Sequence, residues 1–323
     1  HWFRETEEQR YIDAFVEEQA ARGALAADAE GRRVVELEGG PVPLLRSDGS
    51  TLYMSHMVAA ILQRAEFLGP RADVLMSLTG QEQIPAFAQL GEILRRFGYA
   101  DRVEVRHAWH GLVTEGGEKM ASRDGAAPTL DGVYAALCDE VAARVPAALA
   151  PAFARGALRL YLLGRPARRP LDFSLVRCAA EGGAMVADVA RTLRATAEGE
   201  GREEAEDGPP PRALPQALGE WRMRLAAYPA VVDRATRELD PALLVRWLAD
   251  VCGGFCALHR ALRGADGAVP AELGRLHLPL RRTVDHALGL LDAREVEYEM
   301  LPVERGAAPA RRARAAAPAG AAA

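Results

Sequence analysis

The apolar residues between Leu243 and Leu262 recur at intervals of three and four, and this repeat holds over about five helical turns. Side chains at this spacing lie along one face of an α-helix, which must then be buried against other elements. The positions that carry the repeat are Leu243, Leu244, Trp247, Leu248, Val251, Phe255, Leu258 and Leu262. A second repeat follows at Leu280, Val284, Leu288 and Leu291. The two repeats predict an all-α helical bundle in the last third of the chain.

An earlier part of the chain predicts a different architecture. Ala72–Leu78 is a compact apolar run that suits a buried strand. Residues 84–97 predict a helix that ends at Gly98, and Val103–His107 alternates as a strand does. Strand, helix and strand in this order predict half of a doubly wound α/β domain.

Shorter elements are expected around this unit. We expect helices at 4–22, 55–67, 129–144, 151–163 and 172–198. Extended segments are expected at Arg33–Leu37 and Pro43–Leu45, and a turn at Ser47–Gly49 follows the second of them. Residues 198–212 are rich in acidic residues, glycine and proline, so they predict a solvated linker. The tail at 303–323 is mostly Ala, Pro and Arg and is expected to be disordered.

Composition restricts the class of protein. The chain has 323 residues, 49% hydrophobic and 26% charged, which is ordinary for a soluble globular protein. A net charge of -5 argues against DNA binding and non-specific RNA binding, but leaves room for a local basic face. The four cysteines lack metal-ligand spacing, and neither a signal peptide nor a membrane-length apolar run is visible. We therefore expect a cytoplasmic monomer without a metal site.

Three stretches together resemble class I arginyl-tRNA synthetases. Residues 45–53, Leu-Arg-Ser-Asp-Gly-Ser-Thr-Leu-Tyr, are similar to the R-S-D-G-S-x-x-Y segment of that family. Residues 116–125, Gly-Gly-Glu-Lys-Met-Ala-Ser-Arg-Asp-Gly, stand where the family carries its K-M-S-K loop. Residues 239–248 resemble the start of the long helix in the DALR anticodon-binding domain, and Pro170–Phe173 matches a P-L-D-F helix start.

The resemblance implies a domain order. Residues 1–135 would be the C-terminal half of the Rossmann-like catalytic domain, and 136–197 a helical region contacting the tRNA stem. A linker at 198–212 would precede a DALR-type anticodon-binding bundle at 213–302. The first half of the catalytic domain, with its HIGH signature, would lie before His1.

The same resemblance implies catalytic residues in the loop at 119–125. Lys119, the only lysine among the 40 Lys and Arg residues, and Arg123 match loop positions that hold ATP phosphates. An active enzyme would use ATP with Mg²⁺, and no other cofactor is expected. Ala121 and Asp124 depart from the family pattern.

An amino-acid pocket is implied at Tyr53, Glu82 and Gln83. The family has an aspartate four residues after the pocket tyrosine, and its carboxylate grips the arginine guanidinium as a bidentate pair. Met57 stands there in this chain, and Ala86 replaces a histidine that faces ATP in the family. Both substitutions weaken the case for amino-acid activation.

Binding of tRNA is implied for the helical bundle. Its phosphate-facing side would include Arg222, Arg224, Arg234, Arg237 and Arg246, although a mixed solvated face is an equal alternative. Trp247 is a candidate for stacking on RNA bases, although its helical spacing favours core packing.

Three functions remain open at this point. The first, which we prefer, is a tRNA-binding synthetase paralogue whose catalytic site is incomplete or degenerate. The second is an active arginine–tRNA ligase whose N-terminal half is missing from this chain. The third is a transferase or amide ligase that uses aminoacyl-tRNA or an adenylate.

Overall fold

The computed structural model describes residues 3–69, 74–101, 103–119, 129–198, 214–262 and 269–296. The chain divides into two compact units, of which the first comprises residues 1–119 with 166–172 and the second residues 120–165 with 173–323. The tail at 303–323, and the linker from residue 199 on, lie outside the described residues. The finer domain boundaries expected from the sequence stay predictions.

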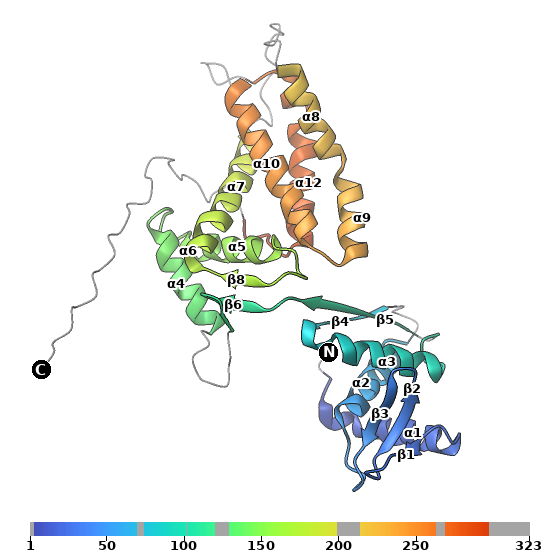
Figure 1. The fold of residues 1–323 in the computed structure, drawn as a ribbon. Coiled ribbons are helices and arrows are strands. Elements are labelled where there is room, and N and C mark those ends of the chain that lie inside the picture. The colour runs from blue at the N-terminus through green and yellow to red at the C-terminus, as the bar shows by residue number, and fades with distance from the viewer. Residues whose placement is uncertain are drawn as a thin grey trace, which may run out of the picture. The chain divides into compact units, whose positions relative to one another are not determined.

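The first unit consists of small sheets and the helices that pack on them (Figure 1). Its elements are η1 (Glu5–Glu7), α1 (Gln9–Ala21), β1 (Ala26–Ala27), β2 (Arg33–Leu37), β3 (Gly40–Leu45), α2 (Tyr53–Leu68), β4 (Val74–Gly80), η3 (Gln81–Gln83), α3 (Ile84–Arg96), β5 (Glu104–His110), β6 (Val113–Glu115) and β7 (Glu118–Lys119). Strands β1, β2 and β3 form an antiparallel sheet. Val35, Leu44, Val58 and Ile93 are fully buried in the core between this sheet and helices α2 and α3.

The predicted strand–helix–strand unit is confirmed. Strands β4 and β5 are parallel, with Leu75 opposite Val105 and Ser77 opposite His107. Parallel neighbours need a crossover connection, which α3 supplies. This helix ends where Gly98 takes a φ of 73°, a conformation that favours glycine.

The prediction that β4 is a buried strand was wrong for one of its faces. Leu75 is 9% exposed, whereas Met76 and Leu78 on the other face are 63% and 70% exposed. Successive side chains of a strand point to opposite faces of its sheet. Among the described strands, β4 pairs only with β5. The hydrophobic core covers the face of this sheet that carries Leu75, whereas the face that carries Met76 and Leu78 is open.

The second unit is helical over its described residues (Figure 1). Its helices are α4 (Leu130–Ala142), α5 (Ala150–Leu163), α6 (Leu175–Arg177), the π-helical turn η5 (Cys178–Gly182), α7 (Gly183–Glu198), α8 (Leu214–Ala226), α9 (Tyr228–Glu238), α10 (Ala242–Leu262), α11 (Ala271–Gly274) and α12 (His277–Leu290). Helix α7 packs against α5, α10 and α12, while α10 also contacts α8 and α9. The bundle predicted from the apolar repeats is therefore present.

Helix α10 is the central element of this bundle. The apolar repeat that predicted it is buried at Trp247, Leu248, Val251 and Phe255, each at most 6% exposed. By length and composition alone, its 21 residues would also suit a membrane-crossing helix. Its contacts with α7, α8 and α9 instead account for its apolar positions as those of a core helix.

The segment matched to a P-L-D-F helix start forms strand β8 (Leu171–Phe173), which lies beside β6 in a sheet of order β7-β6-β8. The helix expected from residue 172 begins instead at Leu175. Ser174 is its N-cap, because the Ser174 side chain accepts a hydrogen bond from the backbone N–H of Arg177.

Candidate functional site

Two of the three predicted pocket residues meet in the structure. Tyr53 is the first residue of α2, and Gln83 ends the short helix η3 that follows β4. The Tyr53 hydroxyl donates a hydrogen bond of 3.0 Å to Oε1 of Gln83. Tyr53 is 58% exposed, so the pair lies at the surface beyond the carboxyl end of β4. Ligands of parallel α/β sheets bind outside this end of the strands.

The third predicted pocket residue, Glu82, lies beside this pair in η3. Its side chain is exposed, and its carboxylate folds back against Gly80, where an added Cβ would overlap it. Glu82 can therefore offer a negative charge at the strand end. The Glu82 carboxylate would suit a cationic ligand, and the Tyr53–Gln83 pair would suit a ligand that forms hydrogen bonds.

Met57 and Ala86, the two substitutions that the sequence resemblance pointed to, lie inside the fold. Met57 is 9% exposed and belongs to the hydrophobic core of the first unit. Ala86 packs partly buried against the same core. Neither a thioether nor a methyl group can supply the carboxylate or the imidazole that the resemblance predicts at these two positions.

A polar pair beneath the strand ends was missed by sequence reasoning. His107 of β5 and Thr79 of β4 are 2.8 Å apart between imidazole Nε2 and hydroxyl Oγ1. Phe87 of α3 stacks on the imidazole with ring centroids 3.9 Å apart. Burial lowers the pKa of His107, so its neutral form is favoured. The alternation of Val103–His107 could have placed His107 on the helix-covered face, but its partner depends on the parallel register.

The predicted catalytic residues are only partly described. Lys119 is the last residue of β7, and its backbone pairs with Thr114 of β6. Arg123 lies outside the described residues, so the structure does not bring the two residues together.

The arginines assigned to RNA phosphates fall into two classes. Arg234 pairs with Glu238 at 2.7 Å, and Arg237 pairs with Asp233 at 2.6 Å, both along α9. The partner carboxylate in each pair offsets the charge that a phosphate would meet.

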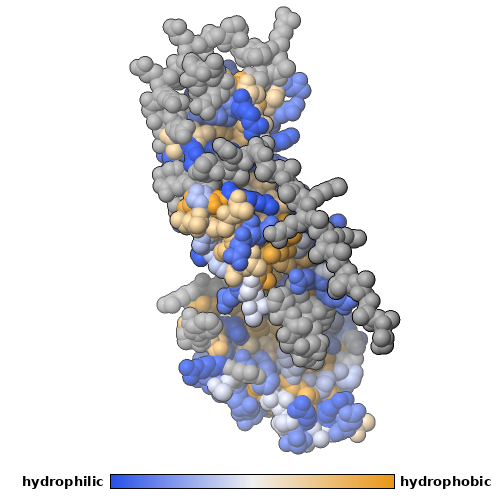
Figure 2. All heavy atoms as spheres, turned by 90° about the vertical axis from the view of Figure 1, so that its left-hand side faces the viewer, coloured by the Kyte–Doolittle hydropathy of each residue, from blue (hydrophilic) through white to orange (hydrophobic). Residues whose placement is uncertain are grey.

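Arg222, Arg224 and Arg246 form the second class. All three are exposed, and none makes an ion pair with a residue that the structure describes. The face of the helical unit seen in Figure 2 carries both hydrophilic and hydrophobic residues.

Trp247 packs in the bundle core, as its helical spacing favoured, and does not stand at the surface as base stacking would require. Trp247 is 6% exposed, and its indole N–H donates to the carbonyl oxygen of Arg224 at 2.8 Å. Its ring lies 4.6 Å from that of Tyr228 between centroids. The side chain is therefore part of the bundle core, where no base can reach it.

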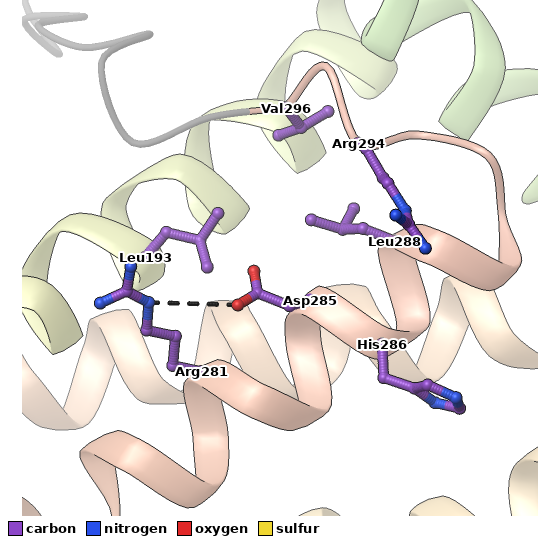
Figure 3. A pocket seen from close by; sticks show the side chains of 7 residues that line it. All are labelled: Leu193, Arg281, Asp285, His286, Leu288, Arg294 and Val296. Carbon is purple, nitrogen blue, oxygen red and sulfur yellow. Dashed lines mark ion pairs between the residues drawn. The ribbon is translucent and has the colours of Figure 1, made fainter.

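A cavity of about 450 Å³ lies within the helical unit. Leu193 of α7 and Leu288 of α12 line its apolar part, and Arg281 and Asp285 approach each other at 4.0 Å from successive turns of α12 (Figure 3). Arg294 adds a second guanidinium. The cavity combines a hydrophobic wall with charged groups of both signs, and none of the predicted pocket residues lines it.

A family model matches the first part of the chain. Residues 5–146 match the catalytic domain of class I tRNA synthetases for arginine. An arginine–tRNA ligase of Lactobacillus johnsonii is 38% identical over 122 residues, covering 36% of this chain and 21% of the relative. The arginine–tRNA ligase of Ligilactobacillus salivarius is 27% identical over 248 residues, covering 72% of this chain and 43% of the relative.

Solved structures show the same fold over a longer stretch. The arginyl-tRNA synthetase of Thermus thermophilus matches with a TM-score of 0.69 at 18% identity, over 88% of this chain and 57% of that protein. The enzyme from Plasmodium falciparum gives a TM-score of 0.69 at 13% identity, over 92% of this chain and 53% of that protein. The chain thus spans about half the length of these relatives or less. The first part of the chain is thus similar in sequence to the catalytic domain of class I arginyl-tRNA synthetases, and the chain shares the fold of these enzymes over most of its length.

Proposed function

We propose that this chain is an arginyl-tRNA synthetase-like protein that binds tRNA through its helical unit and has a degenerate catalytic half. The helical unit would serve as a DALR-type anticodon-binding domain. The observation that carries the proposal is an asymmetry between the two units. The helical bundle is intact around α10, while the catalytic half has Met57 in its core where the family needs a carboxylate.

The helical unit supports the binding part of the proposal. The fold match to a synthetase covers 88% of the chain, which is more than the first unit alone could account for. Arg222 and Arg224 are exposed on α8, and neither forms an ion pair with a described residue. Exposed cations of this kind neutralise RNA phosphates and release their counterions. The overall charge of -5 then limits binding to such local faces.

The first unit supports the degenerate part. A buried thioether offers neither charge nor hydrogen bonds to a guanidinium group, which loses its bidentate partner. The remaining polar groups at the strand end, Tyr53, Glu82 and Gln83, stay available as a weaker pocket. On this proposal, arginine is bound poorly while the RNA surface is retained.

Filter binding of total tRNA at low salt tests the proposal, and retention of tRNA is the expected result. The double variant Arg222→Ala/Arg224→Ala should weaken binding roughly tenfold and reduce the slope of log K against log salt by about one to two. The matched control is Arg234→Ala/Arg237→Ala, which removes two α9 arginines that already have carboxylate partners. Its effect should be smaller. Absence of any tRNA retention by the unaltered chain would refute the proposal.

A specific observation favours a second candidate, an active arginine–tRNA ligase that uses ATP with Mg²⁺. The open face of the β4–β5 sheet carries Val74, Met76 and Leu78, which are 38%, 63% and 70% exposed. Parallel sheets are normally covered on both faces. A preceding half of the catalytic domain, supplied by a longer protein, would cover this face and bring the HIGH signature to the strand ends.

Arginine-dependent exchange between ATP and pyrophosphate by the full-length protein tests this second candidate. Exchange, together with a His-x-Gly-His signature upstream in the reading frame, would establish the active ligase and rule out a degenerate catalytic half. No exchange by the full-length protein, with tRNA binding intact, would leave the first proposal standing.

A further inference from the structure

Strands β6 and β7 form a short hairpin that ends at Lys119. Strand β6 has three residues and β7 has two, and they pair through Glu115 opposite Glu118 and Thr114 opposite Lys119. The turn between them consists of Gly116 and Gly117, with φ angles of 60° and 84°. Two central residues with positive φ are typical of a type I′ hairpin turn. An isolated hairpin this short is not stable in water.

A carboxylate distant in the sequence binds this hairpin. Oδ1 of Asp172 accepts one hydrogen bond from the Thr114 hydroxyl and another from the backbone N–H of Gly117, both of 3.0 Å. Asp172 lies in β8, which is the neighbour of β6 in the sheet. The N–H of Leu171 also donates to the carbonyl oxygen of Leu112 at 2.9 Å. Asp172 therefore contacts both a strand and the turn of the hairpin.

The two bonds to Asp172 act on different parts of the hairpin. Thr114 is the residue that pairs directly with Lys119, and Gly117 is two residues before it. Hydrogen bonds to an ionised acceptor are roughly twice as strong as those between neutral groups. Loss of the carboxylate would free the turn and the strand that leads to Lys119, while the glycines would keep their turn preference.

We propose that Asp172 is a positioning residue, which fixes the β6–β7 hairpin and thereby the backbone at Lys119, the first residue of the loop. This inference rests on the proposed relation to the synthetase family, in which the loop starting at Lys119 meets a phosphate group. Asp172 acts through the hairpin and does not itself touch the phosphate. The ligand class is a phosphate ester, such as a nucleoside triphosphate.

The single lysine of the chain makes a direct test practical. Pyridoxal 5′-phosphate forms an imine with an amine, and borohydride fixes it, so peptide mapping separates the adduct at Lys119 from one at the N-terminal amine. Pyridoxal has the same aldehyde without the phosphate. Comparing the two reagents separates recognition of phosphate from simple access to the amine. Hydrogen–deuterium exchange of residues 113–119 reports the hairpin without any ligand.

Three variants of the full chain would be compared. Asp172→Ala removes the acceptor, Asp172→Asn keeps a carbonyl oxygen at Oδ1, and Thr114→Val removes one of the two bonds. The matched control is Asp28→Ala. Asp28 caps another turn of the first unit, where its Oδ1 accepts from the N–H groups of Glu30 and Arg32 at 3.0 and 2.9 Å.

We expect Asp172→Ala to raise exchange at 113–119 at least fivefold and the half-saturating concentration of pyridoxal 5′-phosphate at Lys119 by a similar factor. The rate with pyridoxal should stay unchanged. Asp172→Asn should restore most of both properties, Thr114→Val should be intermediate, and Asp28→Ala should change neither. These expectations distinguish positioning of Lys119 from a general loss of stability.

Two outcomes bear on different claims. If Asp172→Ala leaves exchange at 113–119 unchanged, or if Asp28→Ala raises it equally, the positioning role is overturned. If the unaltered chain reacts with pyridoxal 5′-phosphate no better than with pyridoxal, the phosphate contact proposed for the loop fails. The exchange measurement then still decides the role of Asp172 in the hairpin.

Discussion

The hydroxyl of Tyr53 and the side-chain carbonyl of Gln83 are 3.0 Å apart, although 30 residues separate them in the sequence. One residue opens a helix and the other closes the turn after a strand. Their contact joins two segments that the sequence suggested separately as parts of a pocket. A surface hydrogen bond between them connects α2 to the end of β4.

Removing this hydrogen bond should affect stability only slightly. Tyr53 is largely exposed, so water can replace its partner, and Tyr53→Phe should lower the free energy of unfolding by less than about 1 kcal/mol. Gln83→Leu should behave similarly. A double-mutant cycle measured by urea unfolding should give a coupling of roughly 0.5–1 kcal/mol. Strictly additive effects would mean that the two side chains do not interact in solution.

Trp247 should contribute to stability and not to RNA binding. Trp247→Ala should cost about 3–5 kcal/mol, because it empties a buried site beside Tyr228 and leaves the carbonyl of Arg224 without its donor. Trp247→Phe should cost less, since it keeps most of the ring packing. Urea unfolding followed by far-UV circular dichroism measures both. A fall in tRNA affinity without a loss of stability would restore the base-stacking role.

Local patterns predicted the helices well. The helix expected at 84–97 is found at Ile84–Arg96, and Gly98 after it has the positive φ expected of a helix stop. The long helix expected from the repeat after Leu243 runs from Ala242 to Leu262. In both cases, the signal and the structure it specifies lie within the same few turns.

Features that depend on distant partners were not predictable in this way. Asp172 was matched to a helix start, but pairing with β6, more than fifty residues earlier, makes its segment a strand. The exposure of Met76 and Leu78 depends on which strands and layers surround β4, and an apolar run does not contain that information.

Candidate binding residues show the same limit. An arginine in the sequence does not reveal whether a carboxylate one helical turn away already pairs with it, as Glu238 does with Arg234. A tryptophan at helical spacing favours a core position without excluding an RNA surface, and burial decides between them. The candidate site could therefore be placed at the strand end from sequence, but its polar pair of Thr79 and His107 required the register of β4 and β5.

Gly111 should not tolerate a side chain. A Cβ at this position would lie 2.5 Å from the carbonyl carbon and oxygen of Arg169 and 2.7 Å from the nitrogen of Pro170. These are backbone atoms and cannot rotate away. The N–H of Gly111 also donates to the carbonyl of Ala167 at 2.8 Å, and this hydrogen bond holds the backbone at Gly111 against residues 167–170.

Gly111→Ala should therefore destabilise the first unit by roughly 1–3 kcal/mol, a value typical of overpacking. The matched control is Gly91→Ala in α3, where a Cβ meets nothing within 4 Å. That change should stabilise the helix by about 0.5–1 kcal/mol, since alanine loses less conformational entropy than glycine. Thermal unfolding of both variants measures the contrast, and equal shifts in the same direction would argue against the close approach at Gly111.

Stability of the helical unit should decrease in mild acid because of His277. This residue is 4% exposed, and neither ring nitrogen has a hydrogen-bond partner among the described residues. Burial, and secondarily the charge of His259, lower the pKa of His277 below its ordinary value of 6.5. The folded state therefore favours the neutral imidazole, whose ring packs 5.7 Å from that of Phe255 between centroids.

The direction of the pH effect follows from this lowered pKa. The unfolded chain takes up a proton on His277 near pH 6.5, before the folded chain does, so unfolding becomes easier as pH falls below that value. Above pH 6.5 both states are neutral at this residue, and its effect on stability vanishes. Urea unfolding at pH 7.5 and 5.5 should show a larger loss for the unaltered chain than for His277→Leu, which cannot bind the proton and keeps an apolar side chain beside Phe255. Equal losses in the two proteins would mean that His277 is charged in the folded bundle, with a partner or water that satisfies it.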